Sequence, residues 1–271
     1  MLADKRIGFI GAGAMAEALI TGVLEAELVS AEQIYISDLK DERLEELEQG
    51  YGVQLVSDNN KLISSVDYII LAVKPKVIAK VLTSLDVEIE GEQKVFSIAA
   101  GIKIKEIERH LKDEVPVIRL MPNTPALIGE GATAYALGRA TDAEDGELVE
   151  EIFSAAGTVI GIEEELMDAV TGLSGSGPAY VYLFIEALAD AGVNVGLGRE
   201  DATDLALQTI IGAAKMVVEL EKHPAQLKDM VTSPGGTTIA ALRQLEKDGF
   251  RSAIYEAVAT ARDKAEELRK E

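Results

Sequence analysis

Short, continuously apolar runs alternate with helical patterns in the first half of the chain, and this alternation constrains its fold most. A strand that is covered on both faces carries apolar side chains at every position, as parallel strands between helices do. Strand and helix in turn therefore predict a doubly wound α/β sheet. The expected strands are residues 6–10, 33–37, 53–56, 68–73, 94–99 and 115–120, with helices over 15–27 and 41–49. Two further strands, 132–137 and 158–162, with a helix from about residue 142 between them, complete the domain.

After about residue 163 the strand-like runs stop and only helical patterns follow. The expected helices are residues 178–191, 200–221, 237–247 and 251–269. The helix over 200–221 is apolar on nearly every face, because Ile210 and Ile211 lie on one stripe while Gly212 and Ala213 occupy other faces. Such a helix is usually buried. We expect it to be buried against a second subunit, and an internal core helix is the alternative.

The composition excludes several classes of protein. Among 271 residues there are 26 basic and 47 acidic side chains, a formal net charge of −21, with no cysteine and two histidines. Disulfides, thiolate metal sites and cysteine nucleophiles are therefore excluded, and we predict no metal site. Nucleic acid is not an expected partner, because phosphate binding needs positive potential. No apolar run approaches the roughly 18 residues of a membrane span, and the N-terminal residues resemble no signal peptide. We therefore expect a cytoplasmic location and no membrane partner.

A glycine turn, Gly11-x-Gly13-x-x-Ala16, lies between an expected strand and an expected helix. In that context the pattern is typical of dinucleotide binding. Gly11 permits the tight turn, Gly13 lets a pyrophosphate approach the backbone, and Ala16 allows close helix packing. The amides of the helix N-terminus then bind the anion. The sequence thus predicts a Rossmann-type, dinucleotide-binding domain over residues 1–163, with an ordinary strand–helix turn as the alternative.

Ser37 and Asp38 end the second expected strand. A carboxylate at this point accepts hydrogen bonds from the ribose hydroxyls of adenosine and repels a 2′-phosphate, which favours NADH over NADPH. Lys40 is close enough in sequence to weaken that repulsion. We expect NADPH or NADH as cofactor, with NADH or mixed use favoured. The alternative for Asp38 is a purely local role in the turn.

A second glycine motif, SPGGTT at residues 233–238, opens the helix expected from residue 237. Gly235 and Gly236 free the backbone to present successive N–H groups as an anion-binding concavity, to which the helix dipole adds. The hydroxyls of Thr237 and Thr238 are expected either to bond a substrate or to cap the helix. In the segment LSGSGP, residues 173–178, Ser176 is similarly expected to cap the helix that follows.

Together, the two glycine motifs predict hydride transfer to a small anionic substrate. Neither histidine is obviously placed for acid–base chemistry. His110 is expected at an exposed helix end, and His223, which precedes Pro224, is expected to mark a helix stop. A reduction that takes its proton from a hydroxyl or from water fits this set of residues.

These residues resemble the pyrroline-5-carboxylate reductase family nearly from end to end. The resemblance rests on GFIGAG (8–13), AVKP (72–75), SIAAG (97–101), RLMPNTP (119–125), GLSGSGPAY (172–180) and SPGGTT (233–238). It implies NAD(P)H-dependent reduction of the cyclic imine 1-pyrroline-5-carboxylate to L-proline, the last step of proline biosynthesis. It also implies an all-helical C-terminal domain, residues 164–271, that binds substrate and forms a homodimer with interlocked helices, in many members assembled into rings of dimers.

The resemblance assigns the cofactor contacts to three groups. Those at the pyrophosphate are Ile10, Gly11, Ala12, Gly13, Ala14 and Met15. Those on the adenosine and ribose side are Asn59, Ala72, Val73, Lys74 and Pro75, to which Ser37 and Asp38 are added from the strand end. Ala99 and Ala100 are assigned to the nicotinamide ribose.

The resemblance also assigns substrate contacts. The carboxylate is expected on the amides of Gly236, Thr237 and Thr238, and Gly235 and Ser176 are further predicted contacts. Thr238 is the predicted catalytic residue, with its hydroxyl directed at the ring nitrogen for proton delivery or relay. Glu164 matches an acid near the substrate, with its register within residues 163–165 open by one residue.

The chain departs from the family pattern at two positions. Asp38 stands where NADPH-using members tend to carry a small hydroxyl or a basic group, and Met230 stands where some members have asparagine near the substrate. Two other functions stay open. One is a reductase of the hydroxyacid-dehydrogenase type, which would need a catalytic lysine such as Lys215. The other is an NAD(P)-binding module without catalysis.

Overall fold

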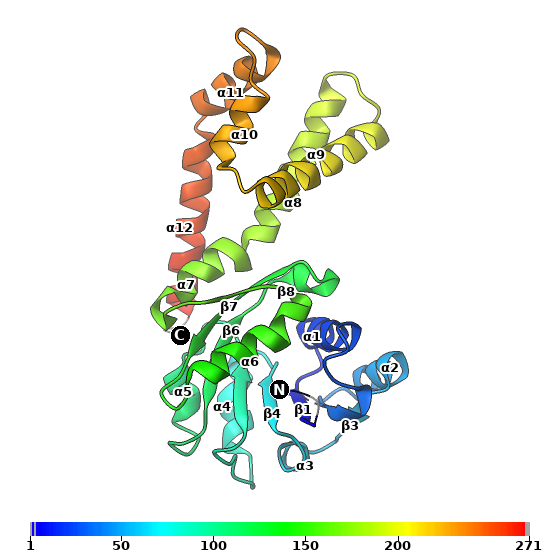
Figure 1. Cartoon of the computed structure of the whole chain (residues 1–271), viewed down its shortest axis with the longest axis vertical. Coiled ribbons are helices and arrows are strands. Elements are labelled where there is room, and N and C mark those ends of the chain that lie inside the picture. The colour runs from blue at the N-terminus through cyan, green and yellow to red at the C-terminus, as the bar shows by residue number, and fades with distance from the viewer. Residues whose placement is uncertain (1, 3, 269–271) are drawn as a thin grey trace. The chain divides into compact units, whose positions relative to one another are not determined.

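The computed structural model describes residue 2 and residues 4–268, which are drawn in Figure 1. By internal contacts the chain divides into two compact units. The first comprises the described residues up to 176 together with those from 261 onward, and the second comprises residues 177–260. The domain boundary predicted between residues 163 and 164 stays a prediction, because a division by contacts need not coincide with a functional domain.

The first unit is built on one eight-stranded sheet in the order β3-β2-β1-β4-β5-β6-β7-β8. The strands are β1 Ile7–Ile10, β2 Ile34–Ser37, β3 Gln54–Leu55, β4 Tyr68–Leu71, β5 Lys94–Ser97, β6 Val117–Met121, β7 Gly131–Leu137 and β8 Gly157–Gly161. The strand order reverses between β1 and β4, which is the switch point where doubly wound sheets bind their ligands. The predicted fold class is confirmed.

One strand pair differs from the expected parallel arrangement. β6 and β7 are antiparallel, with Arg119 opposite Ala136, whereas β7 and β8 are parallel again. The cause is the connection between them. Residues 122–130 are fewer than the dozen or so residues that a parallel crossover needs, so the chain can only turn back on itself.

Helices cover the sheet and make up the second unit. In the first unit they are α1 Ala14–Glu25, α2 Asp41–Tyr51, α3 Asn59–Ile63, α4 Pro75–Thr83, α5 Ile104–Glu108, α6 Ala143–Phe153 and α7 Met167–Val170. They are followed by α8 Gly177–Asn194, α9 Arg199–Leu220, α10 Pro224–Met230, α11 Thr237–Lys247 and α12 Phe250–Leu268. The expected helices are all present, although the predicted end of the last one, Arg269, lies outside the described residues. Five short helices, α3, α4, α5, α7 and α10, were not expected. His223 caps α10, since its Nδ1 accepts the Ala225 N–H at 3.2 Å, rather than only ending the helix before it.

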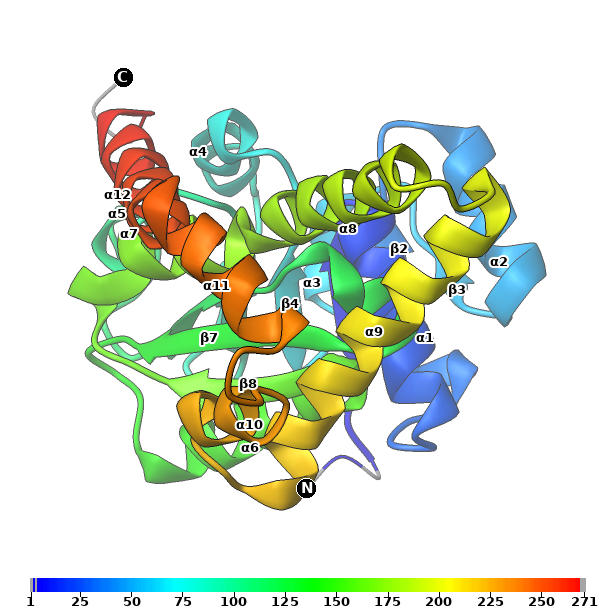
Figure 2. The same cartoon turned by 90° about the horizontal axis from the view of Figure 1, so that it is seen from above.

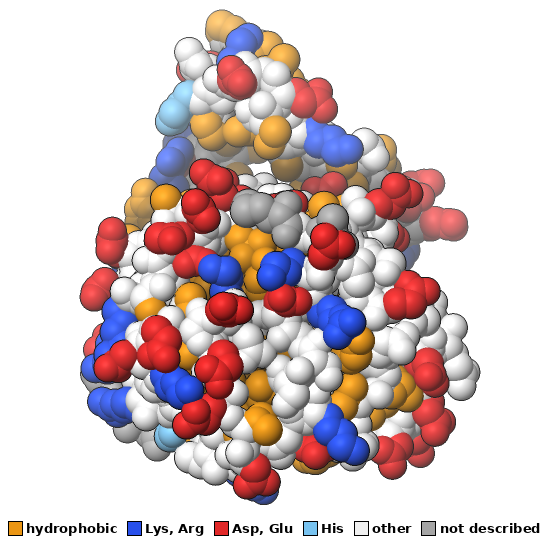
Figure 3. Space-filling model, turned by 60° about the horizontal axis from the view of Figure 1, so that its bottom comes forward, with side chains coloured by type: hydrophobic (Ala, Val, Ile, Leu, Met, Phe, Trp, Pro, Cys, Tyr) orange, Lys and Arg blue, Asp and Glu red, His pale blue; other side chains and the backbone are white. Residues whose placement is uncertain are grey.

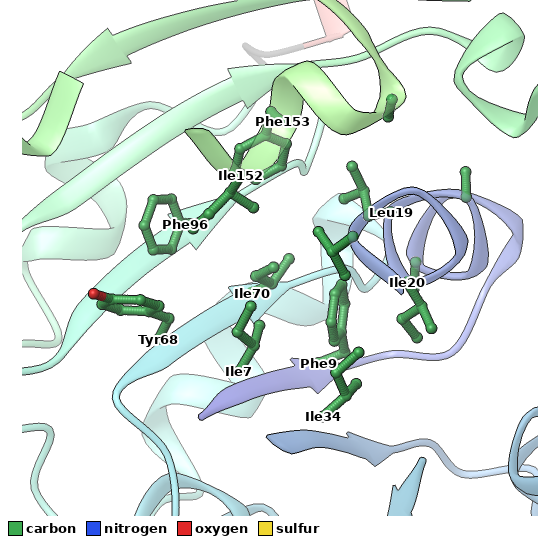
Figure 4. Close-up of a cluster of buried hydrophobic side chains, with 14 of the residues drawn as sticks. Ile7, Phe9, Leu19, Ile20, Ile34, Tyr68, Ile70, Phe96, Ile152 and Phe153 are labelled. Carbon is green, nitrogen blue, oxygen red and sulfur yellow. The ribbon is translucent and has the colours of Figure 1, made fainter. Parts of the chain in front are cut away.

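The strands are apolar at nearly every position because an apolar layer packs against each face of the sheet. On one face, Tyr68 and Ile70 of β4 pack with Phe96 and with Phe153 of α6 (Figure 4). On the other face, Ile69 and Leu71 of the same strand pack with residues of α4 and α5. The Phe96 ring lies 6.0 Å, between ring centroids, from both Tyr68 and Phe153. Successive side chains of a strand point to opposite faces of the sheet. Since both faces are buried here, polar and apolar residues do not alternate along the strand.

The second unit contains helices with few buried side chains. α8 and α9 pack near the turn that joins them, where a Cβ added to Gly192 would lie 3.0 Å from the Ala202 Cβ (Figures 1 and 2). Only Ala202 and Ala206 of α9 are buried, whereas Ile211 is 47% exposed and Val218 is 77% exposed. The apolar character of this helix is therefore not accounted for by burial within the single chain. Among the described helices, none combines the length and the apolar character that a membrane span requires.

Candidate functional site

A cleft of about 770 Å³ opens at the carboxyl ends of β1, β2 and β4, at the switch point of the sheet. Its wall contains most of the predicted cofactor contacts, namely Ile10, Gly11, Ala12, Gly13, Ser37, Asp38, Asn59, Ala72, Val73 and Lys74. Other predicted contacts, namely Ala14, Met15, Pro75, Ala99 and Ala100, do not line it. Open α/β sheets bind ligands in this position, so the cleft suits the adenosine half of a dinucleotide.

Gly11 and Gly13 meet two different requirements of the glycine turn. Gly11 has a φ of 104°, and a Cβ added to it would lie 2.6 Å from the Ala72 carbonyl oxygen. Its N–H donates to the Ser37 carbonyl oxygen at 2.7 Å, which ties the turn to the end of β2. Gly13 is exposed, and an added Cβ would meet no protein atom within 4 Å. Gly11 is therefore needed by the fold itself, whereas the space beside Gly13 is open to a ligand.

The Ala12 peptide is held from both sides. Its N–H donates to Asp38 Oδ2 at 2.8 Å, and its carbonyl oxygen accepts from Arg43 Nε at 2.8 Å. The other Asp38 oxygen accepts the Lys40 N–H at 3.0 Å. Asp38 thus anchors the turn, and since a carboxylate has about four lone-pair sites it can also accept from a ribose hydroxyl. The two roles considered for Asp38 from the sequence are compatible.

Arg43 is a residue that sequence reasoning missed. Besides bonding Ala12, it forms ion pairs with Glu46, at 2.9 Å, and with Glu17. The hydrogen bonds with Glu46 and Glu17 raise the pKa of Arg43 above its usual value, so the guanidinium stays charged. The only signal in the sequence was an arginine in the first turn of the helix after β2, which is weak because such positions often hold solvated charges.

The charge around the cleft differs from the charge of the whole chain. Four basic side chains line it, from Lys40, Arg43, Lys74 and Lys80, against three acidic ones, from Asp38, Glu42 and Glu46. On the face that Figure 3 shows, acidic side chains are dispersed, with basic ones among them. A chain of net charge −21 therefore offers an anionic cofactor a nearly balanced local environment.

Three of the predicted contacts, Ser37, Asn59 and Pro75, also have local structural roles after the strand ends. The Ser37 hydroxyl donates to Asn59 Oδ1 at 2.7 Å, which joins the end of β2 to the start of α3. Pro75 occupies the first turn of α4, where its missing N–H costs nothing because that position has no intrahelical acceptor. The bond between Ser37 and Asn59 thus preforms part of the wall of the cleft.

One carboxylate oxygen of Glu164, Oε1, accepts two hydrogen bonds. This oxygen accepts the Ile104 N–H at 2.7 Å and a proton of Arg119 Nη1 at 3.2 Å. The Arg119 side chain is 2% exposed and that of Glu164 is 24% exposed. Glu164 therefore joins the start of α5 to strand β6. The predicted substrate contact at Glu164 stays a prediction.

The SPGGTT segment forms a glycine turn at the start of α11. Gly235 has a φ of 69°, and Gly236 is the extended residue just before the helix. The Gly236 N–H donates to the Ser233 carbonyl oxygen at 3.1 Å, and a Cβ on Gly236 would lie 2.3 Å from Ser233 Oγ. Thr238 is half-buried in the first helical turn, where N–H groups have no intrahelical partners. The predicted carboxylate contact at the Gly236 N–H is therefore not supported, because that N–H is already bonded within the turn, and the contacts at the Thr237 and Thr238 amides stay predictions.

The predicted cap at Ser176 is wrong. Ser176 has helical dihedral angles, φ −87° and ψ −20°, instead of the extended geometry of an N-cap. A π-helical turn, Thr171–Gly175, immediately precedes it, and the Ser176 N–H already donates to the Thr171 carbonyl oxygen at 2.8 Å. Such π turns occur frequently at functional sites. The assignment of Ser176 as a substrate contact is separate from the cap and stays a prediction.

Comparison with known proteins places this geometry in a family. Residues 164–268 match the model "Pyrroline-5-carboxylate reductase dimerisation". Over 267 residues the chain is 45% identical to a pyrroline-5-carboxylate reductase of Methanosarcina acetivorans, covering 98% of this chain and 99% of the relative. The chain belongs to the pyrroline-5-carboxylate reductase family. The recognition made from its motifs is confirmed.

Solved structures of this family agree in fold and bear on the cofactor. A pyrroline-5-carboxylate reductase from Coxiella burnetii superposes with a TM-score of 0.91 at 35% identity, covering 97% of this chain and 98% of the other. The Plasmodium falciparum pyrroline carboxylate reductase, solved with NADP bound, has a TM-score of 0.87 at 35% identity, with 98% of both chains covered. Residues 6–101 match the model "NADP oxidoreductase coenzyme F420-dependent". These findings support a nicotinamide cofactor for this chain.

The different constraints on the two glycines predict different consequences of adding a methyl group. Gly13→Ala should weaken NAD(P)H binding about 10- to 100-fold, because the methyl group displaces one or two charge-assisted hydrogen bonds to the pyrophosphate. Its free energy of unfolding should change little, because the added Cβ meets no protein atom. Gly11→Ala should instead destabilise the fold, by about 1–3 kcal/mol from backbone strain alone.

Fluorescence titration with NADPH and urea unfolding measure the two effects, and each glycine variant serves as the control for the other. A Gly13→Ala variant with the wild-type dissociation constant would contradict the assignment of the turn amides to the cofactor.

Proposed function

We propose that this chain reduces 1-pyrroline-5-carboxylate to L-proline by hydride transfer from NADPH or NADH. The observation that carries the proposal is the glycine turn at the switch point of the sheet, in a chain that matches this family over nearly its whole length. Residues 1–163 are proposed as the dinucleotide-binding domain and residues 164–271 as the substrate-binding and dimerisation domain, in agreement with the span of the matched dimerisation model.

The first group of residues binds and orients the cofactor. The amides of Gly13, Ala14 and Met15 at the start of α1 bind the pyrophosphate. The wall formed by Asn59 and residues 72–74 contacts the adenosine side, to which Pro75 is added as a proposed contact. Ala99 and Ala100, after β5, are proposed beside the nicotinamide ribose. When bound, the nicotinamide supplies the hydride that adds to the imine carbon.

The second group holds the substrate. The amides of Thr237 and Thr238 fix the carboxylate, because the Gly236 N–H already donates to the Ser233 carbonyl oxygen. Most of the catalytic effect then comes from positioning the imine carbon. The Thr238 hydroxyl donates a hydrogen bond to the ring nitrogen and delivers or relays its proton, which compensates the change of charge there as the hydride arrives. Gly235 and Ser176 are proposed as further contacts.

For the cofactor we propose mixed use with a preference for NADH. The Asp38 carboxylate repels a 2′-phosphate and accepts from ribose hydroxyls. Its negative charge is partly offset by Lys40, Arg43 and Lys80 around the same cleft, which lowers the penalty against NADPH. The charges around the cleft thus support a preference for NADH, but not an exclusion of NADPH.

We propose a homodimer formed through the helical domain, with further assembly into a ring of dimers. The exposed apolar residues of α9, such as Ile211 and Val218, support a partner surface, and the matched family model is described as a dimerisation domain. The cytoplasmic location expected from the sequence stays a prediction.

The activity is tested by following the absorbance of NADH and NADPH at 340 nm with 1-pyrroline-5-carboxylate as substrate. We expect oxidation of both cofactors, a higher kcat/KM with NADH, and L-proline as the product. Consumption of neither cofactor by correctly folded protein would contradict the proposal. Cofactor binding without consumption would favour the non-catalytic module instead.

Removal of the Thr238 hydroxyl tests the proposed proton delivery. Thr238→Ala should lower kcat about 10- to 1000-fold, the range expected when a transition state is deprived of one hydrogen-bond donor, without abolishing turnover. Thr238→Ser retains a hydroxyl and should recover most of the activity. Thr237→Ala is the matched control, because the proposal uses the Thr237 amide rather than its hydroxyl. An unchanged kcat in Thr238→Ala would remove Thr238 from the mechanism.

A further inference from the structure

We propose that Glu164 and Arg119 are positioning residues that fix the loop after β5, residues 98–103, in the geometry needed for hydride transfer. This inference rests on the proposed function, since the loop matters as the contact of the nicotinamide half of the cofactor. In this inference Glu164 does not contact the substrate directly, but affects the reaction by fixing the backbone of the loop.

Arg119 lies beside the point where the loop begins. In the sheet it pairs with Ser97, the last residue of β5. Its guanidinium is buried in an otherwise apolar strand, VIRLM. A buried guanidinium needs a partner to be tolerated, and Glu164 supplies one at 3.2 Å. The pair thereby fixes Glu164 against the sheet next to the end of β5.

Glu164 holds the point where the loop ends. The same oxygen that accepts from Arg119 accepts the N–H of Ile104, the first residue of α5. α5 has only five residues, so it has little stability of its own to hold its N-terminus in place. The Lys103 N–H is bonded to Glu106 Oε2 at 2.7 Å, which holds the end of the loop to α5, and the Glu164 bond links that end to Arg119 of the sheet.

The bonds between residues 97 and 102 are long. The Ile102 N–H donates to the Ala99 carbonyl oxygen at 3.5 Å, and the Ala99 N–H donates to Ser97 Oγ at 3.4 Å. Gly101 has a φ of 78°, so the chain reverses there. The Ile98 N–H donates to the Leu71 carbonyl oxygen at 3.2 Å at the start of the loop. A loop with weak internal bonds takes its geometry from its two ends.

The position of this loop gives its geometry a chemical consequence. In a doubly wound sheet the two βαβαβ halves bind the two halves of a dinucleotide, so the carboxyl end of β5 belongs to the nicotinamide half. Displacement of a reacting group by about 1 Å can cost about 100-fold in rate. A shift of the loop is therefore expected to change kcat more than ground-state binding.

The test compares Glu164→Ala, Glu164→Gln and the matched control Glu165→Ala, which removes a neighbouring exposed carboxylate. All are measured well below their unfolding midpoints. Glu164→Ala should lower kcat about 10- to 100-fold, with KM for 1-pyrroline-5-carboxylate nearly unchanged. Its deuterium isotope effect with 4-deuterated NADH should rise, because hydride transfer becomes slower relative to the other steps. Glu164→Gln keeps an acceptor oxygen for Ile104 and Arg119 and should recover most of kcat, and Glu165→Ala should equal the wild type.

Hydrogen exchange provides a readout that does not depend on activity. Glu164→Ala should exchange faster than the wild type in peptides covering residues 98–108, and Glu164→Gln and Glu165→Ala should not. Unchanged exchange there would overturn the positioning role even if the wild type proved inactive, whereas an inactive wild type with the predicted exchange pattern would overturn only the proposed function. A raised KM at unchanged kcat in both Glu164 variants would instead show direct substrate contact and overturn the inference.

Discussion

The close approach of the Gly11 backbone to the Ala72 carbonyl is the constraint on which the cofactor site depends. It brings the segments after β1 and β4 together at the switch point and leaves no room for a Cβ. The Gly11 N–H donates to the Ser37 carbonyl oxygen and the Ala12 N–H donates to Asp38, and these two bonds attach the end of β2 to the same turn. Three strand ends are therefore fixed around one peptide turn. The start of α1 lies beside the cleft because this turn fixes where the helix begins.

The acidic composition and an anionic cofactor are compatible because the anions are assigned to backbone amides. Glycine turns before α1 and α11 present N–H groups that cost no side-chain charge. The few basic side chains at the cleft are paired or balanced by carboxylates, as the ion pairs of Arg43 with Glu17 and Glu46 show. Net charge thus argues against polyanion partners but contains little information about a single bound dinucleotide.

Much of the fold and part of the site could be predicted from the sequence. The alternation of apolar runs predicted the sheet because burial on both faces leaves a local signature in each strand. The reversal at β7 was missed because it depends on the length of the connection, not on the strand's own residues. α4 was missed although Pro75 marks its first turn, because a nine-residue helix leaves a short pattern. The glycine turn was predictable because its constraint is local.

Contacts between distant segments could not be predicted. The Glu164 contacts span 45 residues to Arg119 and 60 residues to Ile104. Nothing in the sequence near Glu164 specifies which of the three adjacent glutamates faces the sheet. The bond from Arg43 to Ala12 has the same origin, since it arises only when β1 and β2 are paired. A side chain whose role is to fix a distant segment is not marked by a motif in the sequence around it.

A crystal structure with NADH and L-proline bound is the most direct test of the central claim that backbone amides hold both anions. The account predicts pyrophosphate oxygens about 3 Å from amide nitrogens among Gly13, Ala14 and Met15, with Asp38 still bonded to Ala12. It also predicts the proline carboxylate on the amides of residues 237 and 238. A pyrophosphate held by the side chains of Lys40, Lys74 or Lys80, with the turn amides unoccupied, would contradict it.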